Sequence, residues 1–275
     1  MTKGLALILG FVFIAAAGAS AARFIERELP CPVCGKVFYA KLDLSGSQGE
    51  MRLDLKPVGP EAGPWRLPDC PRCGFVIYKL PIPAAELAKC REIAASEEYK
   101  KDQARSTYFR VGLIYEKLGK SAFSVASSFL KASWQEEDEA ARLKEDQELS
   151  LKYFTVCAQA CGAEEKENSQ LLIGELLRRL GRFEEARAHL AGLRGLKGFQ
   201  KNFFADIVEY QLRLCSKLDP APYEMADVRE FKKPLLEKIK NKLNNIFRDL
   251  AGMAGYKTGG ALPARKMYSP NVDAQ

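Results

Sequence analysis

A short cysteine motif, C-P-x-C-G, occurs twice in this chain, at Cys31–Gly35 and again at Cys70–Gly74. One C-x-x-C can arise by chance, but two copies of the longer motif constrain the fold strongly. Two thiolates spaced in this way can bind one tetrahedral zinc ion, and the glycine that follows permits a turn in which backbone N–H groups approach the sulfurs. The predicted ligands of one structural zinc ion are Cys31, Cys34, Cys70 and Cys73. A shell of four sulfurs leaves no open position for water, which argues against a catalytic metal.

Strand-like runs follow both motifs, at residues 37–42 and 75–78, and the alternating residues 51–55 could add a third strand. Together they predict a small zinc-ribbon-like module over residues 22–83. The spacer between the motifs is longer than in the simplest pattern of this kind and is rich in Gly, Pro and Ser, so it is interpreted as an inserted loop.

Two other interpretations of the cysteines stay open. A thioredoxin-like redox pair is expected at a helix N-terminus inside a βαβ unit, whereas a glycine and a strand pattern follow here. Two structural disulfides are the second alternative, and an oxidising compartment would favour them.

The N-terminus has the pattern of an export signal. Lys3 is followed by an apolar run from Leu5 to Gly18 and then by the small residues 19–22. Residues 1–21 are therefore predicted to be a signal peptide, cleaved after Ala21, that sends the protein to the periplasm or cell envelope. The alternative is an uncleaved segment over residues 5–22 that tethers the chain to the membrane, because a segment of 18 residues is at the lower limit of what can span a bilayer.

From Ala84 the chain is expected to form successive amphipathic helices. The predicted spans are 84–98, 103–118, 121–135, 139–161, 166–180, 183–194, 200–217 and 227–250. Residues 111–120 align with 173–182, and in each stretch a glycine inside the helix precedes a second glycine seven residues later. These features predict a degenerate tetratricopeptide-like array over residues 84–218, whose concave surface would bind a protein partner. A helical bundle without a groove is the alternative.

The positive charge of the chain is concentrated at its C-terminal end. The formal net charge is +7, and residues 229–275 hold ten Lys or Arg against four Asp or Glu. Residues 219–252 are predicted to form a basic amphipathic helix, and residues 253–275 a flexible tail. The helix could seal the last repeat or contact an anionic membrane surface. No nucleic-acid partner is expected.

The remaining cysteines and the single histidine give no indication of catalysis. Cysteines 90, 157, 161 and 215 lie in helical patterns and are predicted to be buried as small apolar side chains. A disulfide between Cys157 and Cys161, four residues apart on one helix, would need distorted geometry. His189 is expected to pack or to lie at the surface. One histidine excludes most acid–base and metallohydrolase schemes, so the chain is predicted not to be an enzyme.

Three features of the sequence carry a family resemblance: the two cysteine motifs with the residues that follow them (Cys31–Phe38 and Cys70–Phe75), the stretch Arg52–Asp54, and the helical body. Together they resemble a bacterial family catalogued as domain of unknown function 2225. The resemblance covers roughly residues 29–215. It implies a zinc-binding module fused to a helical repeat, with no assigned reaction. The export segment departs from the pattern of many members.

The sequence thus predicts a mainly α protein in which a small N-terminal β module precedes a helical array. Its predicted function is that of an exported, non-enzymatic scaffold with structural zinc and a protein partner in the cell envelope. The alternatives are an envelope thiol–disulfide protein that uses one C-x-x-C pair, and a membrane-surface adaptor that acts through the basic C-terminal helix.

Overall fold

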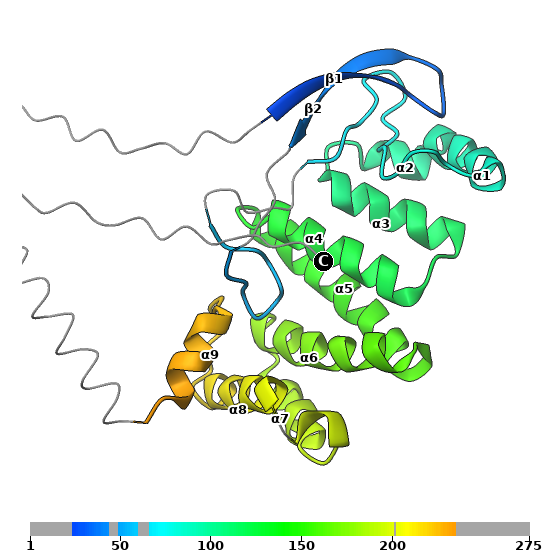
Figure 1. The fold of residues 1–275 in the computed structure, drawn as a ribbon. Helices are drawn as coiled ribbons and strands as arrows, with labels where there is room; N and C mark the ends of the chain where they lie inside the picture. Colours follow the sequence, from blue (N-terminus) through cyan, green and yellow to red (C-terminus); the bar gives the residue numbers. More distant parts are fainter. Residues whose placement is uncertain (1–23, 44–48, 60–65, 201, 235–275) are drawn as a thin grey trace, which may run out of the picture. The chain divides into compact units, whose positions relative to one another are not determined.

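The computed structural model describes residues 24–43, 49–59, 66–200 and 202–234. The chain is mainly helical, with one antiparallel pair of strands at its N-terminal end (Figure 1). The predicted class, a mainly α protein with a small N-terminal β element, is confirmed at this level. The predicted signal peptide, the C-terminal tail and residues 235–252 of the predicted helix 219–252 lie outside the described residues. In the described part of that predicted helix, only Met225–Lys232 is helical, so the prediction was too long there. The described residues up to Val228 form one compact unit, and those from Arg229 belong to a second.

The sheet is a ribbon of two strands, β1 (Phe24–Pro30) and β2 (Val37–Asp43). The register pairs Phe24 with Asp43 and Pro30 with Val37, so the first cysteine motif forms the turn between the strands. The strand predicted at residues 37–42 is therefore confirmed, and its partner is the segment before the motif.

The other two predicted strands do not form. Residues 75–78 contribute a single bridge between Asp69 and Val76, and residues 51–55 form a turn. The turn is closed by a hydrogen bond from the Arg52 N–H to the Lys56 carbonyl, and Leu55 adopts a φ of 64°. A chain that reverses within five residues cannot also extend as a strand.

Nine α-helices and one 3₁₀ turn lie within the described residues. They are α1 (Ala84–Ala95), α2 (Glu97–Lys101), α3 (Thr107–Leu118), α4 (Ala122–Gln135), α5 (Ala140–Ala160), α6 (Ala163–Arg179), α7 (Phe183–Leu193), the 3₁₀ turn Lys197–Phe199, α8 (Asn202–Ser216) and α9 (Met225–Lys232). From α3 to α8 each α-helix packs against the next along the chain. No helix of the described residues is both long and apolar enough to cross a membrane.

Serine side chains set the starts of several helices. The predicted helix 84–98 is in fact two helices, because Ser96 is extended and its Oγ accepts a hydrogen bond from the Tyr99 N–H. Ser106 and Ser121 cap α3 and α4 in the same way. A serine at this position satisfies one of the N–H groups that the first turn of a helix leaves without a partner.

Two helix glycines allow neighbouring helices to approach closely. A Cβ on Gly112 of α3 would lie 2.7 Å from the ring of Phe129 in α4. A Cβ on Gly174 of α6 would lie 2.5 Å from Cδ2 of Leu190 in α7. Gly119 ends α3 with a φ of 67°, a conformation that glycine adopts without steric cost.

The largest apolar cluster joins helices α4 to α8, with Phe154, Leu176 and Leu190 among its buried members. A second cluster joins the two cysteine motifs to α1, α2 and α3, and includes Phe75, Tyr99 and Ile114. The β ribbon and the first helices therefore share one core.

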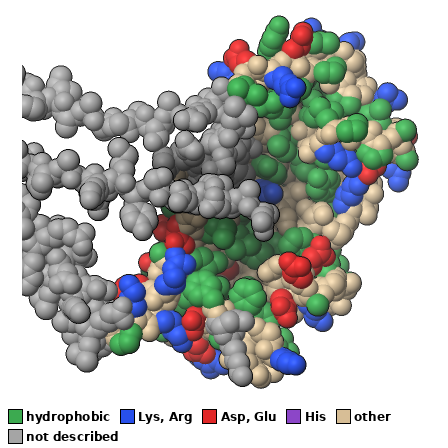
Figure 2. Space-filling model, viewed as in Figure 1, with side chains coloured by type: hydrophobic (Ala, Val, Ile, Leu, Met, Phe, Trp, Pro, Cys, Tyr) green, Lys and Arg blue, Asp and Glu red, His purple; other side chains and the backbone are tan. Residues whose placement is uncertain are grey.

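The face shown in Figure 2 is hollowed, and hydrophobic side chains gather in the hollow.

The spacer between the cysteine motifs reaches the last helices. Leu53 is 3% exposed and packs with α8 and α9, and its N–H donates to the carbonyl of Tyr223. The guanidinium of Arg52 and the ammonium of Lys56 both pair with Glu137, just beyond α4. Part of what the sequence indicated as an inserted loop, residues 50–58, is thus a segment fixed against the helices.

Candidate metal centre

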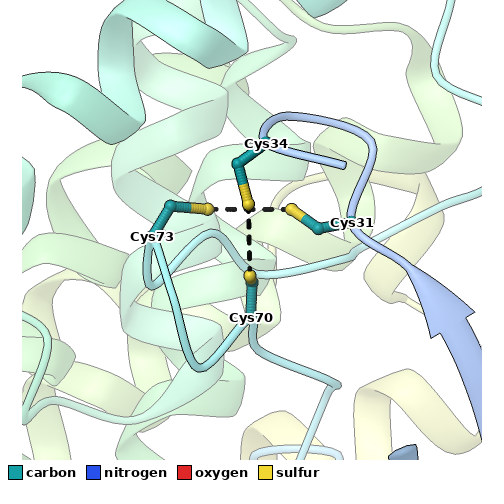
Figure 3. Close-up of side chains that lie close together, drawn as sticks. All are labelled: Cys31, Cys34, Cys70 and Cys73. Atoms are coloured by element: carbon teal, nitrogen blue, oxygen red, sulfur yellow. Dashed lines mark hydrogen bonds between the residues drawn. The ribbon is translucent and has the colours of Figure 1, made fainter. Parts of the chain in front are cut away.

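The four cysteines predicted as metal ligands lie together. Their Sγ atoms all fall within 4.8 Å of one another, and the side chains point to a common centre from two separate turns (Figure 3). Two of the pairs join the two motifs: Cys31 Sγ lies 3.7 Å from Cys73 Sγ, and Cys34 Sγ lies 3.6 Å from Cys70 Sγ. Cys31 and Cys70 are buried, whereas Cys34 and Cys73 are partly exposed.

The two motifs fold in the same way. In the first, the Gly35 N–H donates to the carbonyl of Cys31, and the Cys31 N–H donates to the carbonyl of Lys36. Gly74, Cys70 and Phe75 repeat this pattern in the second. Gly35 and Gly74 have φ values of 72° and 70°, so both occupy the left-handed region that favours glycine. The final glycine of C-P-x-C-G is therefore required by the backbone of the turn.

Backbone N–H groups face the sulfurs, as the motif predicts. The N–H of Cys34 donates toward the sulfur of Cys31, that of Lys36 toward Cys34, and that of Phe75 toward Cys73. Burial outweighs these contacts at Cys31 and Cys73 and raises their pKa values. At the more exposed Cys34, burial is outweighed by the hydrogen bonds from Lys36 and Cys70, which lower its pKa to about 7.

These distances match tetrahedral coordination better than covalent bonds between the sulfurs. A metal with metal–sulfur bonds of about 2.3 Å would place the sulfurs of a regular tetrahedron about 3.8 Å apart. A disulfide requires about 2.05 Å, and all four thiols are free. The turn of Cys31 and Cys34 lies between two strands, which is not the helix N-terminus that activates a redox pair. The arrangement is therefore one that can hold a metal ion.

Side chains from the helices hold the second turn in place. Nη1 of Arg110, in α3, donates to the carbonyl of Gly74 at 2.9 Å, and its Nη2 donates to the carboxylate of Asp69 at 2.8 Å. The hydroxyl of Tyr99, in α2, donates to the same Gly74 carbonyl and accepts from the Val76 N–H. Sequence analysis missed these residues because 23 to 41 positions separate the partners and no local pattern connects them.

The four other cysteines divide into two groups. Cys90 and Cys215 are buried and free, as predicted. Cys157 is also buried, as predicted, but Cys161 is only partly buried, and the two form a disulfide that the prediction did not include. Cys161 lies just after the last residue of α5, where the backbone becomes extended and is no longer bound to helical geometry. This freedom allows the two sulfurs to meet, which the interior of a helix would resist.

His189 has a packing role, in agreement with its prediction. Its ring is half-buried in α7, and Nε2 lies 2.8 Å from the carbonyl of Gln170 in the neighbouring helix. Burial lowers the pKa of this imidazole despite the contact with Gln170.

No family model, curated protein or solved structure matches this chain. The resemblance to domain of unknown function 2225 therefore stays a prediction.

Proposed function

We propose that this chain is a non-enzymatic scaffold of the cell envelope, in which a structural zinc ion stabilises a ribbon-like module and a helical array binds a protein partner. The observation that carries the proposal is the convergence of four cysteine sulfurs from two matching turns. Four thiolates form a closed shell around zinc, so the metal acts on folding and not on a substrate.

The size of the β module supports a structural role for the metal. A ribbon of two strands is marginally stable by itself in water. In this chain the first turn belongs to the ribbon, and the second turn is hydrogen-bonded to Arg110 and Tyr99 of the helical part. A metal held by both turns would therefore join the ribbon to α1, α2 and α3.

The order of the helices supports a tetratricopeptide-like array. Consecutive helices from α3 to α8 pack against one another, and Gly112 and Gly174 allow close approach at two helix pairs. In arrays of this kind neighbours share a core and leave an extended surface that binds peptides or proteins.

Metal analysis of the full chain, purified from its native compartment without chelators, tests the zinc site. We expect one equivalent of zinc per chain and, after exchange for cobalt, the visible absorption of a tetrahedral cobalt–thiolate centre. Cys34→Ser should reduce the zinc content strongly, whereas Cys90→Ala, which removes a buried free thiol outside the cluster, should retain it. Less than half an equivalent of zinc in the unsubstituted protein, with the four cysteines oxidised, would overturn this part of the proposal.

The scaffold role is tested by photo-crosslinking in the native envelope. A photoreactive residue at Ser127, on the surface between α3 and α4, should yield one dominant cross-linked protein. The same residue at Glu184, an exposed position on α7, is the control. Equal, diffuse labelling from both positions would contradict the scaffold role. N-terminal sequencing of the recovered chain tests export, with a start near Ala22 expected.

A further inference from the structure

A groove of about 390 Å³ lies between α3 and α4, next to the segments that flank the second cysteine motif. Its lining residues are Leu67, Tyr78, Tyr108, Val111, Tyr115, Phe123, Ser124, Ser127, Ser128 and Lys131. This volume is within the range of pockets that bind small ligands or the end of a peptide.

The two helices give the groove walls of different character. The α3 wall is aromatic and apolar, because Tyr108, Val111 and Tyr115 lie three and four residues apart and share one face of the helix. The α4 wall begins with Phe123 and is otherwise polar, because Ser124, Ser127, Ser128 and Lys131 follow the same spacing. A ligand in this groove would meet aromatic rings on one side, and hydroxyls and an ammonium on the other.

Among the described residues that line the groove, Lys131 is the only charged one. Its Nζ lies 5.3 Å from the ring centre of Tyr108, and no carboxylate among the described residues pairs with it. Burial alone lowers the pKa of this ammonium. Lys56 and Lys120, by contrast, each have a carboxylate partner. An ammonium partly removed from water without a counter-ion favours a ligand that brings a negative charge.

The groove combines this charge with aromatic surface over a short distance. The ring of Tyr78 meets that of Tyr115 edge to face, with centroids 5.2 Å apart, and adds to the apolar wall. A ligand that suits both walls carries one anionic group close to an apolar group. The terminal residue of a polypeptide has this combination, since its α-carboxylate and its side chain leave the same carbon atom.

We propose that the groove between α3 and α4 binds the free C-terminal carboxylate of a partner polypeptide whose last side chain is apolar or aromatic. The carboxylate pairs with Lys131, and the last side chain packs against Tyr108, Val111 and Tyr115. This inference rests on the proposed scaffold function and names the part of the partner that the array binds.

The experiment compares two synthetic peptide libraries of the same sequences, one with a free C-terminal carboxylate and one with a C-terminal amide. Each library is passed over the immobilised full chain, and retained peptides are identified by mass spectrometry. The affinity of the most enriched acid and of its amide twin is then measured by fluorescence anisotropy. We expect the acid to bind at least about tenfold more tightly, which is the effect of one charge-assisted hydrogen bond.

Variants at Lys131 assign the effect to the groove. Lys131→Met should remove the preference for the acid, and Lys131→Arg should keep most of it. Lys152→Met is the matched control, because Lys152 also lies over an aromatic ring, 4.9 Å from the centre of Tyr153, but is exposed and outside the groove. Thermal unfolding of each variant shows whether a loss of binding reflects a loss of the fold.

Three results would overturn the inference: equal binding of acid and amide, retention of the acid preference in Lys131→Met, or enrichment of internal Asp or Glu without regard to the C-terminus. In each case a single partner cross-linked from Ser127 in the envelope would leave the scaffold function standing. If neither library is retained and no partner is cross-linked, the scaffold function fails as well.

Discussion

The guanidinium of Arg110 donates a hydrogen bond of 2.8 Å to the carboxylate of Asp69, the residue directly before Cys70. Arg110 is 1% exposed, and its other terminal nitrogen donates to the carbonyl of Gly74 at the end of the same turn. Burial tends to raise the pKa of Asp69, but the hydrogen bonds from Arg110 and Arg66 outweigh it and lower the pKa. One buried side chain of α3 thus holds both ends of the second cysteine turn.

Arg110→Met should destabilise the protein by about 2 kcal/mol, because the Gly74 carbonyl then keeps only the Tyr99 hydroxyl as a partner and the partly buried Asp69 carboxylate keeps only the exposed Arg66. Denaturant unfolding of the metal-loaded full chain measures the loss. Arg142→Met, which removes an exposed pair with Glu139, should change stability by less than about 1 kcal/mol. Equal effects of the two substitutions would contradict a role for Arg110 in holding the turn.

Alkylation can count how many of the eight cysteines are free thiols and how many are in disulfides. Alkylation in denaturant with a chelator and no reductant should label six cysteines per chain and leave Cys157 and Cys161 unlabelled. Prior reduction should raise the number to eight. If only two cysteines react without reductant, and they prove to be Cys90 and Cys215, the two motifs hold disulfides and not a metal.

Gly112→Ala should destabilise the chain by about 1–3 kcal/mol, the usual cost of overpacking a core. The new methyl would lie 2.7–2.9 Å from three ring carbons of Phe129, which is itself fixed between Phe109 and Tyr153. Gly192→Ala is the control, because it also replaces a helix glycine but meets nothing within 4 Å. The control should be neutral or stabilising by up to about 1 kcal/mol, since alanine favours the helix. Thermal and denaturant unfolding would compare the two variants.

Asp146 should make the stability fall as pH rises. Burial and the neighbouring carboxylate of Glu136 raise its pKa to about 8, although Arg105 opposes this shift. The folded state therefore keeps a proton that the unfolded chain has released above about pH 4, so this contribution is present below that pH and is lost as pH rises toward 8. Asp146→Asn removes the titrating carboxyl group and with it this pH-dependent contribution to stability.

The free energy of unfolding of Asp146→Asn should therefore rise relative to that of the unsubstituted protein between about pH 4 and pH 8. Urea titrations of both proteins across this range measure the difference. A difference that does not change with pH would show that the carboxyl group of Asp146 titrates normally in the folded state.

Local sequence patterns were sufficient wherever the physical cause is local. The trailing glycines of the cysteine motifs predicted turns, and Gly35 and Gly74 adopt the positive φ that such turns need. Helical periodicity predicted the elements from α3 to α8 to within a few residues. The error at Ser96 has a local cause too: an internal serine was interpreted as part of one helix, although its side chain caps the next.

Contacts between distant segments were decided by the tertiary structure. The sequence by itself determined that four cysteines in two equivalent turns could share a centre, because their spacing and glycines fix the shape of each turn. Only the folded chain shows that Arg110 and Tyr99 hold the second turn, that residues 50–58 reach α8 and α9, and that Cys161 lies where α5 has ended and can bond to Cys157. No repeating spacing in the sequence links the residues that make these contacts, so only the packing of the folded chain brings them together.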